Sequence, residues 1–151
     1  MCATGRRRTA TARRVVEHYV LDAYALLAWL GDEAGAGQVE HLLTTAVGGE
    51  CRLSISMVNL GEVMYTIERR LGAERAAATL ALLDQLPVEQ VAVNRDLALR
   101  AARVKAARRM GYADCFAVAL AVADGAKLVT GDRDFEEVED VAAIEWLAAN
   151  H

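Results

Sequence analysis

The sequence predicts an α/β fold: a three-layer α/β/α sandwich built on a parallel sheet of about five strands. Two observations favour it. Short β-rich apolar runs alternate with longer segments of helical periodicity, in the order β-α-α-β-α-α-β-α-α-β-α-β. Strands that alternate with helices form parallel sheets covered on both faces. The run at 127–130 is followed at once by Gly131 and Asp132, as where a buried strand opens into the crevice at its carboxyl end.

The first half of the chain is predicted to contain two strands and four helices. Strand one ends at Asp22, strong helix formers follow it, and the acids Asp32 and Glu33 open the next helix because negative charge is favoured there. Pro87 closes the last helix of this half. The elements are a strand at 18–21, helices at 23–30 and 32–46, a strand at 52–56, and helices at 57–71 and 73–86.

The second half is predicted to alternate strands with a basic and an apolar helix. Gly111 is expected to end the basic helix. The next helix is apolar on nearly all sides, which indicates burial. Gly131 is expected to make a sharp turn, because glycine has no Cβ penalty. The elements are a strand at 88–93, helices at 95–110 and 112–123, a strand at 127–130, an acidic segment at 134–140 and a strand within 141–147.

Composition indicates one globular domain at residues 18–151, preceded by a basic and disordered extension at 1–17. Five of the 17 basic residues lie in the first 14 positions and none of the 21 acidic residues does. The acidic remainder suits a cation pocket better than a general nucleic-acid surface. No apolar run reaches the roughly 20 residues that cross a membrane. Three scattered cysteines suggest neither a zinc site nor disulfides, so a cytoplasmic location is expected.

Four acidic side chains stand where burial is expected. Asp22 and Asp132 each follow a strand, Glu62 lies one turn into the helix after the second strand, and Asp114 opens the apolar helix. Strand carboxyl ends and the starts of the following helices share one edge of a parallel sheet. Three of these acids therefore converge by topology, and Asp114 joins them if its helix starts at that edge.

Each acid also has an ordinary structural explanation. Asp22 and Asp114 suit helix N-caps, Glu62 a solvated helix face, and Asp132 a turn. As a group, however, they are costly, because two carboxylates about 4 Å apart repel by about 4 kcal/mol at an effective dielectric constant near 20. Such a cluster needs shared protons or a cation. Oxygen ligands without His or Cys select a hard ion, Mg²⁺ or Mn²⁺.

Each of the four acids lies in a short sequence stretch of its own. The stretches are Val20-Leu21-Asp22-Ala23-Tyr24-Ala25-Leu26-Leu27, Asn59-Leu60-Gly61-Glu62-Val63, Tyr112-Ala113-Asp114-Cys115-Phe116-Ala117 and Leu128-Val129-Thr130-Gly131-Asp132-Arg133-Asp134-Phe135. In their order and spacing, from about residue 19 to 147, these four stretches resemble the PIN-domain ribonucleases of the VapC toxin type. Two departures from the family pattern remove no ligand: Ala23 stands where many members have Ser or Thr, and Cys115 replaces a common small residue.

This resemblance implies a site and a reaction. The catalytic and metal-binding quartet would be Asp22, Glu62, Asp114 and Asp132, with Thr130 orienting a carboxylate or a metal-bound water. The reaction would be hydrolysis of RNA phosphodiesters assisted by Mg²⁺ or Mn²⁺, leaving a 5′-phosphate and a 3′-hydroxyl. The protein would be a cytoplasmic, homodimeric toxin whose cognate antitoxin inserts a C-terminal tail into the acidic groove.

Two other functions stay open. A catalytically silent PIN-like module that only binds a partner would be marked by an incomplete quartet, and this quartet is complete. A haloacid-dehalogenase-type phosphatase needs a second acid two residues after its nucleophile, where this chain has Tyr24. Tyr24 and Trp29 are expected in core or dimer contacts. The basic residues of the helix at 95–110 form either a rim for the RNA backbone or a solvated face.

Overall fold

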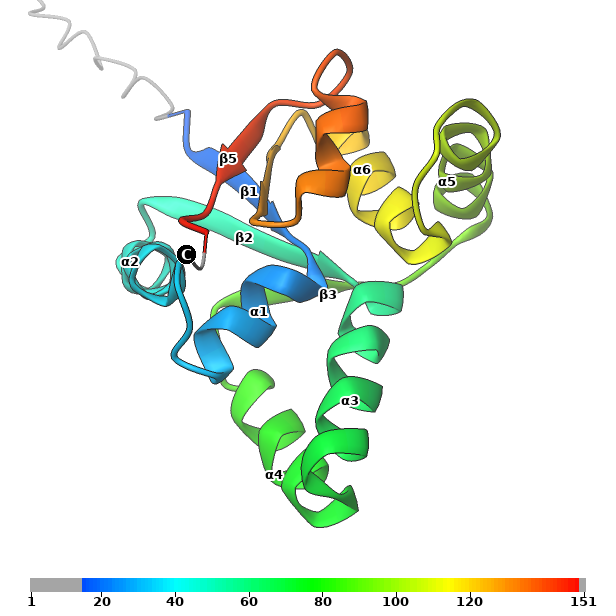
Figure 1. Cartoon of the computed structure of the whole chain (residues 1–151). Coiled ribbons are helices and arrows are strands. Elements are labelled where there is room, and N and C mark those ends of the chain that lie inside the picture. Colours follow the sequence, from blue (N-terminus) through cyan, green and yellow to red (C-terminus); the bar gives the residue numbers. More distant parts are fainter. Residues whose placement is uncertain (1–14, 150–151) are drawn as a thin grey trace, which may run out of the picture.

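The computed structural model describes residues 15–149 and contains one five-stranded parallel sheet with helices on both faces (Figure 1). The predicted α/β sandwich is confirmed. Residues 1–14 of the predicted extension lie outside the described residues, and Glu17 already belongs to the first strand. The elements are β1 (Glu17–Leu21), α1 (Ala23–Leu30), α2 (Ala36–Val47), β2 (Cys51–Ser56), α3 (Met57–Leu71), α4 (Ala73–Leu83), β3 (Val88–Val91), α5 (Arg95–Ala107), α6 (Tyr112–Asp124), β4 (Lys127–Thr130), the 3₁₀ helix η1 (Arg133–Val138) and β5 (Ile144–Trp146).

The sheet has a hydrophobic core on each face because successive strand residues point to opposite sides. In β1, Val20 packs with α5 and α6, whereas Leu21 packs with the side chains of α1 to α4. In β4 the same division separates Leu128 from Val129, and all four side chains are fully buried. These strands therefore read as continuous apolar runs, as expected of a parallel sheet covered on both sides.

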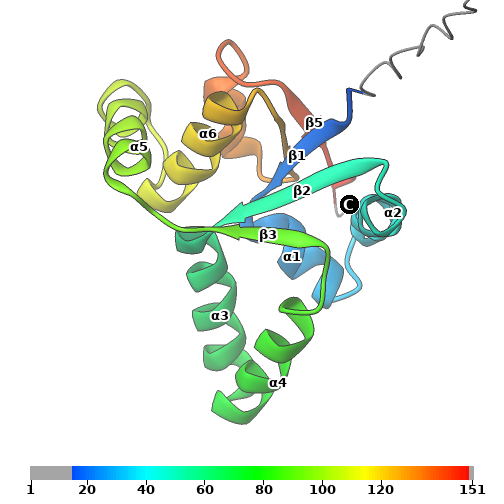
Figure 2. The ribbon, with the colours of Figure 1, turned by 180° about the vertical axis from the view of Figure 1, so that it is seen from behind.

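The strand order creates a crevice beside β1. The order is β3-β2-β1-β4-β5, so the chain first builds outwards from β1 through β2 to β3 and then returns to the other side of β1. Figure 2 shows β3 at the outer edge, from which the chain passes to α5. Leu21 and Val129 are register partners in β1 and β4. The residues that follow these two strands thus meet at the point where the strand order reverses, the usual ligand site of such sheets.

Several predicted boundaries are wrong. The second helix does not begin at Asp32 and Glu33 but at Ala36. Asp32 has a left-handed φ of 49° and Gly35, the N-cap, one of 89°, so the acids lie in a turn. The helix α4 ends at Leu83, not at residue 86. The reason is local, since proline disfavours the helical conformation in the residue before it, and two turns replace the last helical residues.

The junction between α5 and α6 also differs from the prediction. The helix α5 ends at Ala107, and Gly111 is the N-cap of α6 rather than the stop of α5. Arg108 has an extended backbone and donates two hydrogen bonds to the carboxylate of Asp140 and one to the carbonyl of Glu137. This docking onto the loop after η1 draws the chain out of the helix. The strand β3 is also shorter than predicted, ending at Val91, whereas β5, at Ile144–Trp146, lies within the predicted range.

Within residues 15–149, no helix combines the length and the apolar character that a membrane span requires.

Candidate active site

Asp22 sits at the junction of β1 and α1, beside the end of β4. Its backbone is extended and its Oδ1 accepts a 2.9 Å hydrogen bond from the amide of Ala25, so it is the N-cap of α1. Its Oδ2 accepts a 2.5 Å hydrogen bond from the hydroxyl of Thr130. Only 2 % of Asp22 is exposed. The N-cap explanation of Asp22 is therefore confirmed, and the second oxygen remains directed towards the end of β4.

Asp132 is tied to the same network through the turn that follows β4. Its backbone amide donates a 3.1 Å hydrogen bond to the hydroxyl oxygen of Thr130, and its Oδ1 accepts from the amide of Asp134 at 3.0 Å. Asp132 thus begins η1 as its N-cap, as the turn explanation expects. A single hydroxyl, fully buried at Thr130, connects the two strand-terminal acids.

Glu62 lies on the first turns of α3, whose start is held by Ser56 and Asn59. Ser56 is the N-cap, accepting from the amide of Asn59 and donating a 2.6 Å hydrogen bond to its Oδ1. The Asn59 amide group then donates a 3.0 Å hydrogen bond to the carbonyl of Ala113. This bond ties the start of α3 to the start of α6. Glu62 Oε2 is buried and has no hydrogen-bond partner among the residues described, so a purely solvated role for Glu62 is wrong.

Asp114 occupies the first turn of α6 and is not its N-cap. Gly111 holds that position, without a side-chain hydrogen bond, so the capping explanation of Asp114 is wrong. The Asp114 Oδ2 atom lies 3.4 Å from where a Cβ of Gly111 would stand. Because Ala113 is bonded to Asn59, the start of α6 lies at the same sheet edge as the start of α3. The condition for Asp114 to join the other acids is met.

The charges of these acids act on one another. Burial raises the pKa of Asp22 to about 7, although the hydrogen bonds from Thr130 and Ala25 lower it. The negative charges of Asp114 and Asp132 add to the rise. Burial also raises the pKa of Asp114 to about 6, with further contributions from Glu62, Asp132 and Asp134. The pKa of Glu62 is raised by burial and by Asp132, with Asn59 acting in the opposite direction. The charge of Asp132 thus contributes to the raised pKa of each of the other three acids.

The donor chemistry of this cluster fits a hard divalent cation. Within residues 15–149, no Lys or Arg forms an ion pair with any of the four carboxylates, and Glu62 Oε2 is a buried acceptor without a donor. No three His, Cys, Asp or Glu side chains in that range converge closely enough to enclose an ion by themselves. Mg²⁺ does not require this, because it usually takes one or two carboxylates and keeps several waters.

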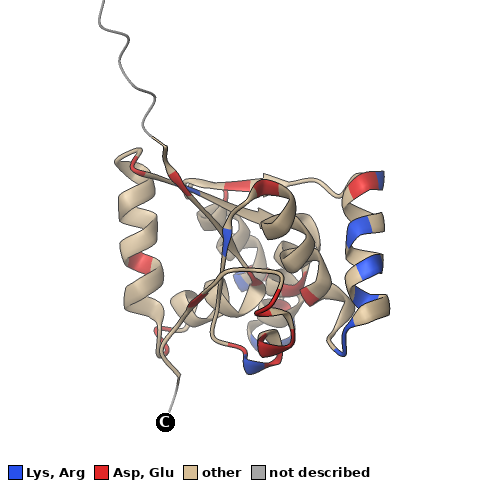
Figure 3. Ribbon diagram, turned by 90° about the horizontal axis from the view of Figure 1, so that it is seen from above, with Lys and Arg blue, Asp and Glu red and all other residues tan. Residues whose placement is uncertain are grey.

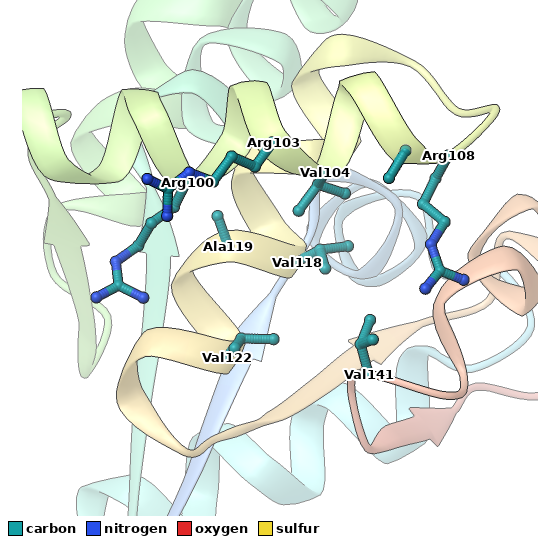
Figure 4. Close-up of a pocket in the computed structure, with 9 residues that line it drawn as sticks. Arg100, Arg103, Val104, Arg108, Val118, Ala119, Val122 and Val141 are labelled. Atoms are coloured by element: carbon teal, nitrogen blue, oxygen red, sulfur yellow. The ribbon is translucent and has the colours of Figure 1, made fainter.

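The basic residues gather elsewhere. Lys and Arg line α5, on the right in Figure 3, but several of them already have partners within the chain: Arg100 pairs with Asp96, Arg108 with Asp140, and Lys105 donates to the carbonyl of Met110. A groove of about 290 Å³ lies between α5, α6 and Val141, with Arg100, Arg103 and Arg108 on its rim (Figure 4). None of the four acids lines it, so this groove is separate from the carboxylate cluster.

Two residues of the site have roles that the sequence interpretation missed. The sequence pattern predicts no role for Asn59, which is fully buried and shares the buried face of α3 with Val63 and Ile67. The spacing of these three residues, i, i+4 and i+8, was the signal for a shared face. The expected reason for Gly131 is also wrong, since its φ is not in the left-handed region. The space taken by Tyr24 explains this glycine instead, because a Cβ there would lie 2.4 Å from the ring.

The comparisons with known proteins agree with this fold. The family model described as PIN domain matches residues 19–141. No curated protein matches the chain. Among solved structures, VapBC2 from Rickettsia felis bound to a promoter DNA fragment matches with 17% identity, 87% coverage of this chain, 99% of that chain and a TM-score of 0.69. DNA-bound VapBC from Salmonella typhimurium matches with 21% identity, 86% coverage of this chain, 98% of that chain and a TM-score of 0.67. VapC20 from Mycobacterium tuberculosis, a Sarcin-Ricin loop cleaving toxin, matches with 23% identity, 78% coverage of this chain, 92% of that chain and a TM-score of 0.57.

Proposed function

The chain belongs to the PIN domain family, and from this premise we propose that it is a metal-dependent ribonuclease and the toxin of a toxin–antitoxin pair. The observation that carries the proposal is the cluster of Asp22, Glu62, Asp114 and Asp132. These acids come from four separate parts of the chain and have no cationic partner within residues 15–149. Burial raises the pKa of Asp22, Glu62 and Asp114, and the charge of Asp132 adds to each rise. A structural role for four such acids would leave their repulsion uncompensated.

The four acids would hold Mg²⁺ or Mn²⁺. When bound, the cation supplies Lewis-acid stabilisation of the charge that develops on the phosphate. Thr130 supports this role indirectly, because its hydroxyl holds Asp22 through Oδ2 and Asp132 through its backbone amide. Asn59 keeps the helices that bear Glu62 and Asp114 together. The proposed ligands therefore stand on a hydrogen-bonded frame rather than on free loops.

The proposed reaction is in-line hydrolysis of an RNA phosphodiester. The oxygen of a water attacks phosphorus, the bond from phosphorus to the 3′ oxygen breaks, and the products are a 5′-phosphate and a 3′-hydroxyl. Glu62 Oε2, buried and without a donor among the described residues, accepts the proton that the attacking water loses. A carboxylate whose pKa is raised towards neutrality suits such a transfer. The departing 3′ oxygen takes up a proton from solvent.

A structured RNA loop is the proposed substrate. The support is the similarity to VapC20, which cleaves the Sarcin-Ricin loop, together with the edge position of the acid cluster, which an extruded loop can reach. A cytoplasmic location follows from this substrate class. The exposed basic residues of α5, among them Arg95 and Arg103, would provide further contacts to the RNA backbone away from the acidic cluster.

An antitoxin is the proposed protein partner. Two similar structures are VapBC complexes. In this chain the hairpin of α3 and α4 projects away from the sheet (Figure 1) and exposes five large apolar side chains, namely Met57, Tyr65, Leu71, Leu80 and Leu82. Exposed apolar residues gathered in this way are typical of a binding surface. We also propose a homodimer, which light scattering of the purified protein would detect.

The alternative functions are less well supported. A phosphatase of the haloacid-dehalogenase type would need a second acid two residues after Asp22, and this chain has Tyr24 at that position. A catalytically silent PIN module differs from the proposed nuclease only in activity. The experiment below separates these two.

The test is cleavage of defined tRNAs and ribosomal loop RNAs by the purified chain with Mg²⁺ or Mn²⁺. The substitutions Glu62→Gln and Asp114→Asn keep the side-chain volume and remove the charge. Each should lower the rate strongly, and the double variant should be hardly slower than the worse single one, because residues that act as a unit are non-additive. Glu68→Gln on α3 and Asp124→Asn on α6 are matched controls on the same helices, away from the acidic edge.

The metal-free proteins provide a second measurement. Asp114→Asn should leave the melting temperature unchanged or raise it, because it relieves like-charge repulsion. Loss of cleavage with retained stability would mark a functional cluster. Equal cleavage by the wild type and both charge-removing variants would exclude Glu62 and Asp114 as the groups that cleave RNA. No cleavage by the wild type would favour the silent module. In cells, the wild type should slow growth and Asp22→Asn should not.

A further inference from the structure

Gly131 lies against the outer end of the Tyr24 side chain. A Cβ at position 131 would stand 2.4 Å from Cε1, 2.8 Å from Cζ and 3.1 Å from the hydroxyl oxygen of Tyr24. The ring therefore occupies the place that any side chain at position 131 would take. Tyr24 is half-buried and packs against the core on the α1 side of the sheet.

Space for this ring, and not backbone conformation, requires the glycine. The φ of Gly131 lies outside the left-handed region, in contrast to Gly125 with a φ of 59°, so the backbone at 131 would accept alanine. The atoms that would clash are those of a rigid ring. Its own backbone stands in the first turn of α1, which is anchored by the bond from the Ala25 amide to Asp22. A methyl group at position 131 would therefore displace the ring, the turn 130–132 or both.

The contact falls on the turn that joins the two strand-terminal acids. Gly131 separates Thr130, whose hydroxyl binds Asp22, from Asp132, whose amide binds that same hydroxyl. A shift of Gly131 would change the direction of the Asp132 amide and would stretch or break this link. Tyr24 itself follows Asp22 by two residues, so the ring bridges the start of α1 and the end of β4.

We infer that Tyr24 is a positioning residue of the acidic site: its ring, fitted against Gly131, sets the turn 130–132 and thereby the place of Asp132 relative to Asp22. This inference rests on the proposed function, because it assigns the ring to the metal-binding geometry. The ring acts through the backbone of Gly131 and needs no contact with substrate. The hydroxyl group of Tyr24 is not required for it.

The test uses the full chain and four variants: Gly131→Ala, Tyr24→Ala, Tyr24→Phe and the double variant Tyr24→Ala/Gly131→Ala. Mn²⁺ binding is measured by calorimetry and the metal-free melting temperature by a thermal scan. Gly131→Ala should weaken Mn²⁺ binding on the order of 10-fold, as the loss of a supporting contact around metal ligands does. Gly37→Ala is the control, since its added methyl group meets nothing within 4 Å, and it should bind Mn²⁺ like the wild type.

The double variant distinguishes positioning from simple packing. Removing the ring makes room for the new methyl group, so Tyr24→Ala/Gly131→Ala should bind Mn²⁺ several-fold more tightly than Gly131→Ala. Tyr24→Phe keeps the ring and should retain the affinity, whereas Tyr24→Ala should lose part of it. RNA cleavage should follow the same order. A merely structural contact would lower the melting temperatures and leave the Mn²⁺ affinity of the folded protein unchanged.

Two results would overturn the inference alone. One is a Gly131→Ala variant that binds Mn²⁺ as tightly as an active wild type. The other is a Tyr24→Phe variant as defective as Tyr24→Ala, which would assign the effect to the hydroxyl group. If the wild type neither binds Mn²⁺ nor cleaves RNA, the proposed function fails and the inference fails with it. The metal-free melting temperatures of the four variants would then still report whether the two residues are coupled.

Discussion

The hydroxyl of Thr130 and the carboxylate of Asp22 are joined by a 2.5 Å hydrogen bond between residues 108 positions apart in the chain. Both residues are buried. The same hydroxyl oxygen accepts a hydrogen bond from the amide of Asp132, while its single proton is donated to Asp22. The Thr130 hydroxyl therefore joins the end of β1, at Asp22, to the end of β4.

Replacement of Thr130 by valine should therefore damage the site at nearly constant volume. Thr130→Val removes the donor to Asp22 and leaves the amide of Asp132 without its acceptor, which should cost about 1–3 kcal/mol of unfolding free energy. RNA cleavage should fall by roughly 10- to 100-fold, and Thr130→Ser should retain most of it. Urea unfolding and a cleavage assay provide the measurements.

A matched control for that variant is Thr79→Val on α4. The Thr79 hydroxyl bonds only to the carbonyl of Arg75 and is exposed, so its loss should change stability by less than about 0.5 kcal/mol. Unchanged cleavage by Thr130→Val would show that the hydroxyl has no part in the site.

The metal-free protein should lose stability as the pH rises towards neutrality. Asp22 has an ordinary pKa of 3.8 and a folded pKa of about 7, so between these values the folded state binds more protons than the unfolded one. Stability that depends on this group is then present below about pH 4 and is lost as the pH rises to about 7, by at most about 1.4 kcal/mol per pH unit.

Urea unfolding in EDTA at about pH 5 and about pH 7.5 measures this slope. Asp22→Asn should show a flatter profile, and Asp124→Asn should behave like the wild type. A wild-type stability that stays level or increases across this window would contradict the burial-raised pKa of Asp22.

Divalent cations should reverse the instability of the acidic cluster. Mn²⁺ or Mg²⁺ at 100 times its Kd should stabilise the folded state by about 2.7 kcal/mol and raise the melting temperature. Binding should tighten with rising pH, because the ligands must lose protons. Asp114→Asn should remove most of the effect, while Asp124→Asn, at the other end of the same helix, should preserve it. No binding of either ion at millimolar concentration would refute the metal site.

Asn59 should support the site by holding the starts of α3 and α6 together. Asn59→Ala removes the donor to the carbonyl of Ala113 and the partner of Ser56, at an expected cost of about 1–3 kcal/mol. It should also weaken Mn²⁺ binding, because the starts of α3 and α6 are no longer tied together. Asn94→Ala, which removes the N-cap of α5, should cost about 1 kcal/mol and leave Mn²⁺ binding intact. Equal Mn²⁺ affinity for both variants would contradict this role.

The sequence by itself determined the order of the elements and the places of the four acids. Apolar runs that stop at Asp22 and at Gly131-Asp132 mark strand ends through neighbouring residues alone, and α1, α3 and β4 lie where their local patterns predict. Boundaries were least predictable where distant contacts decide them. Arg108 ends α5 because its side chain reaches Asp140, and no pattern near Arg108 indicates this.

Only the tertiary structure decided how the acids meet. Parallel pairing puts β4 beside β1 and so brings Thr130 to Asp22, the Asn59 bond brings the start of α6 to α3, and the ring of Tyr24 explains Gly131. The raised pKa of Asp22 depends on burial, which is a property of the folded chain. Local propensity acts between residues a few positions apart, whereas hydrogen bonds, desolvation and close packing depend on which distant residues become neighbours.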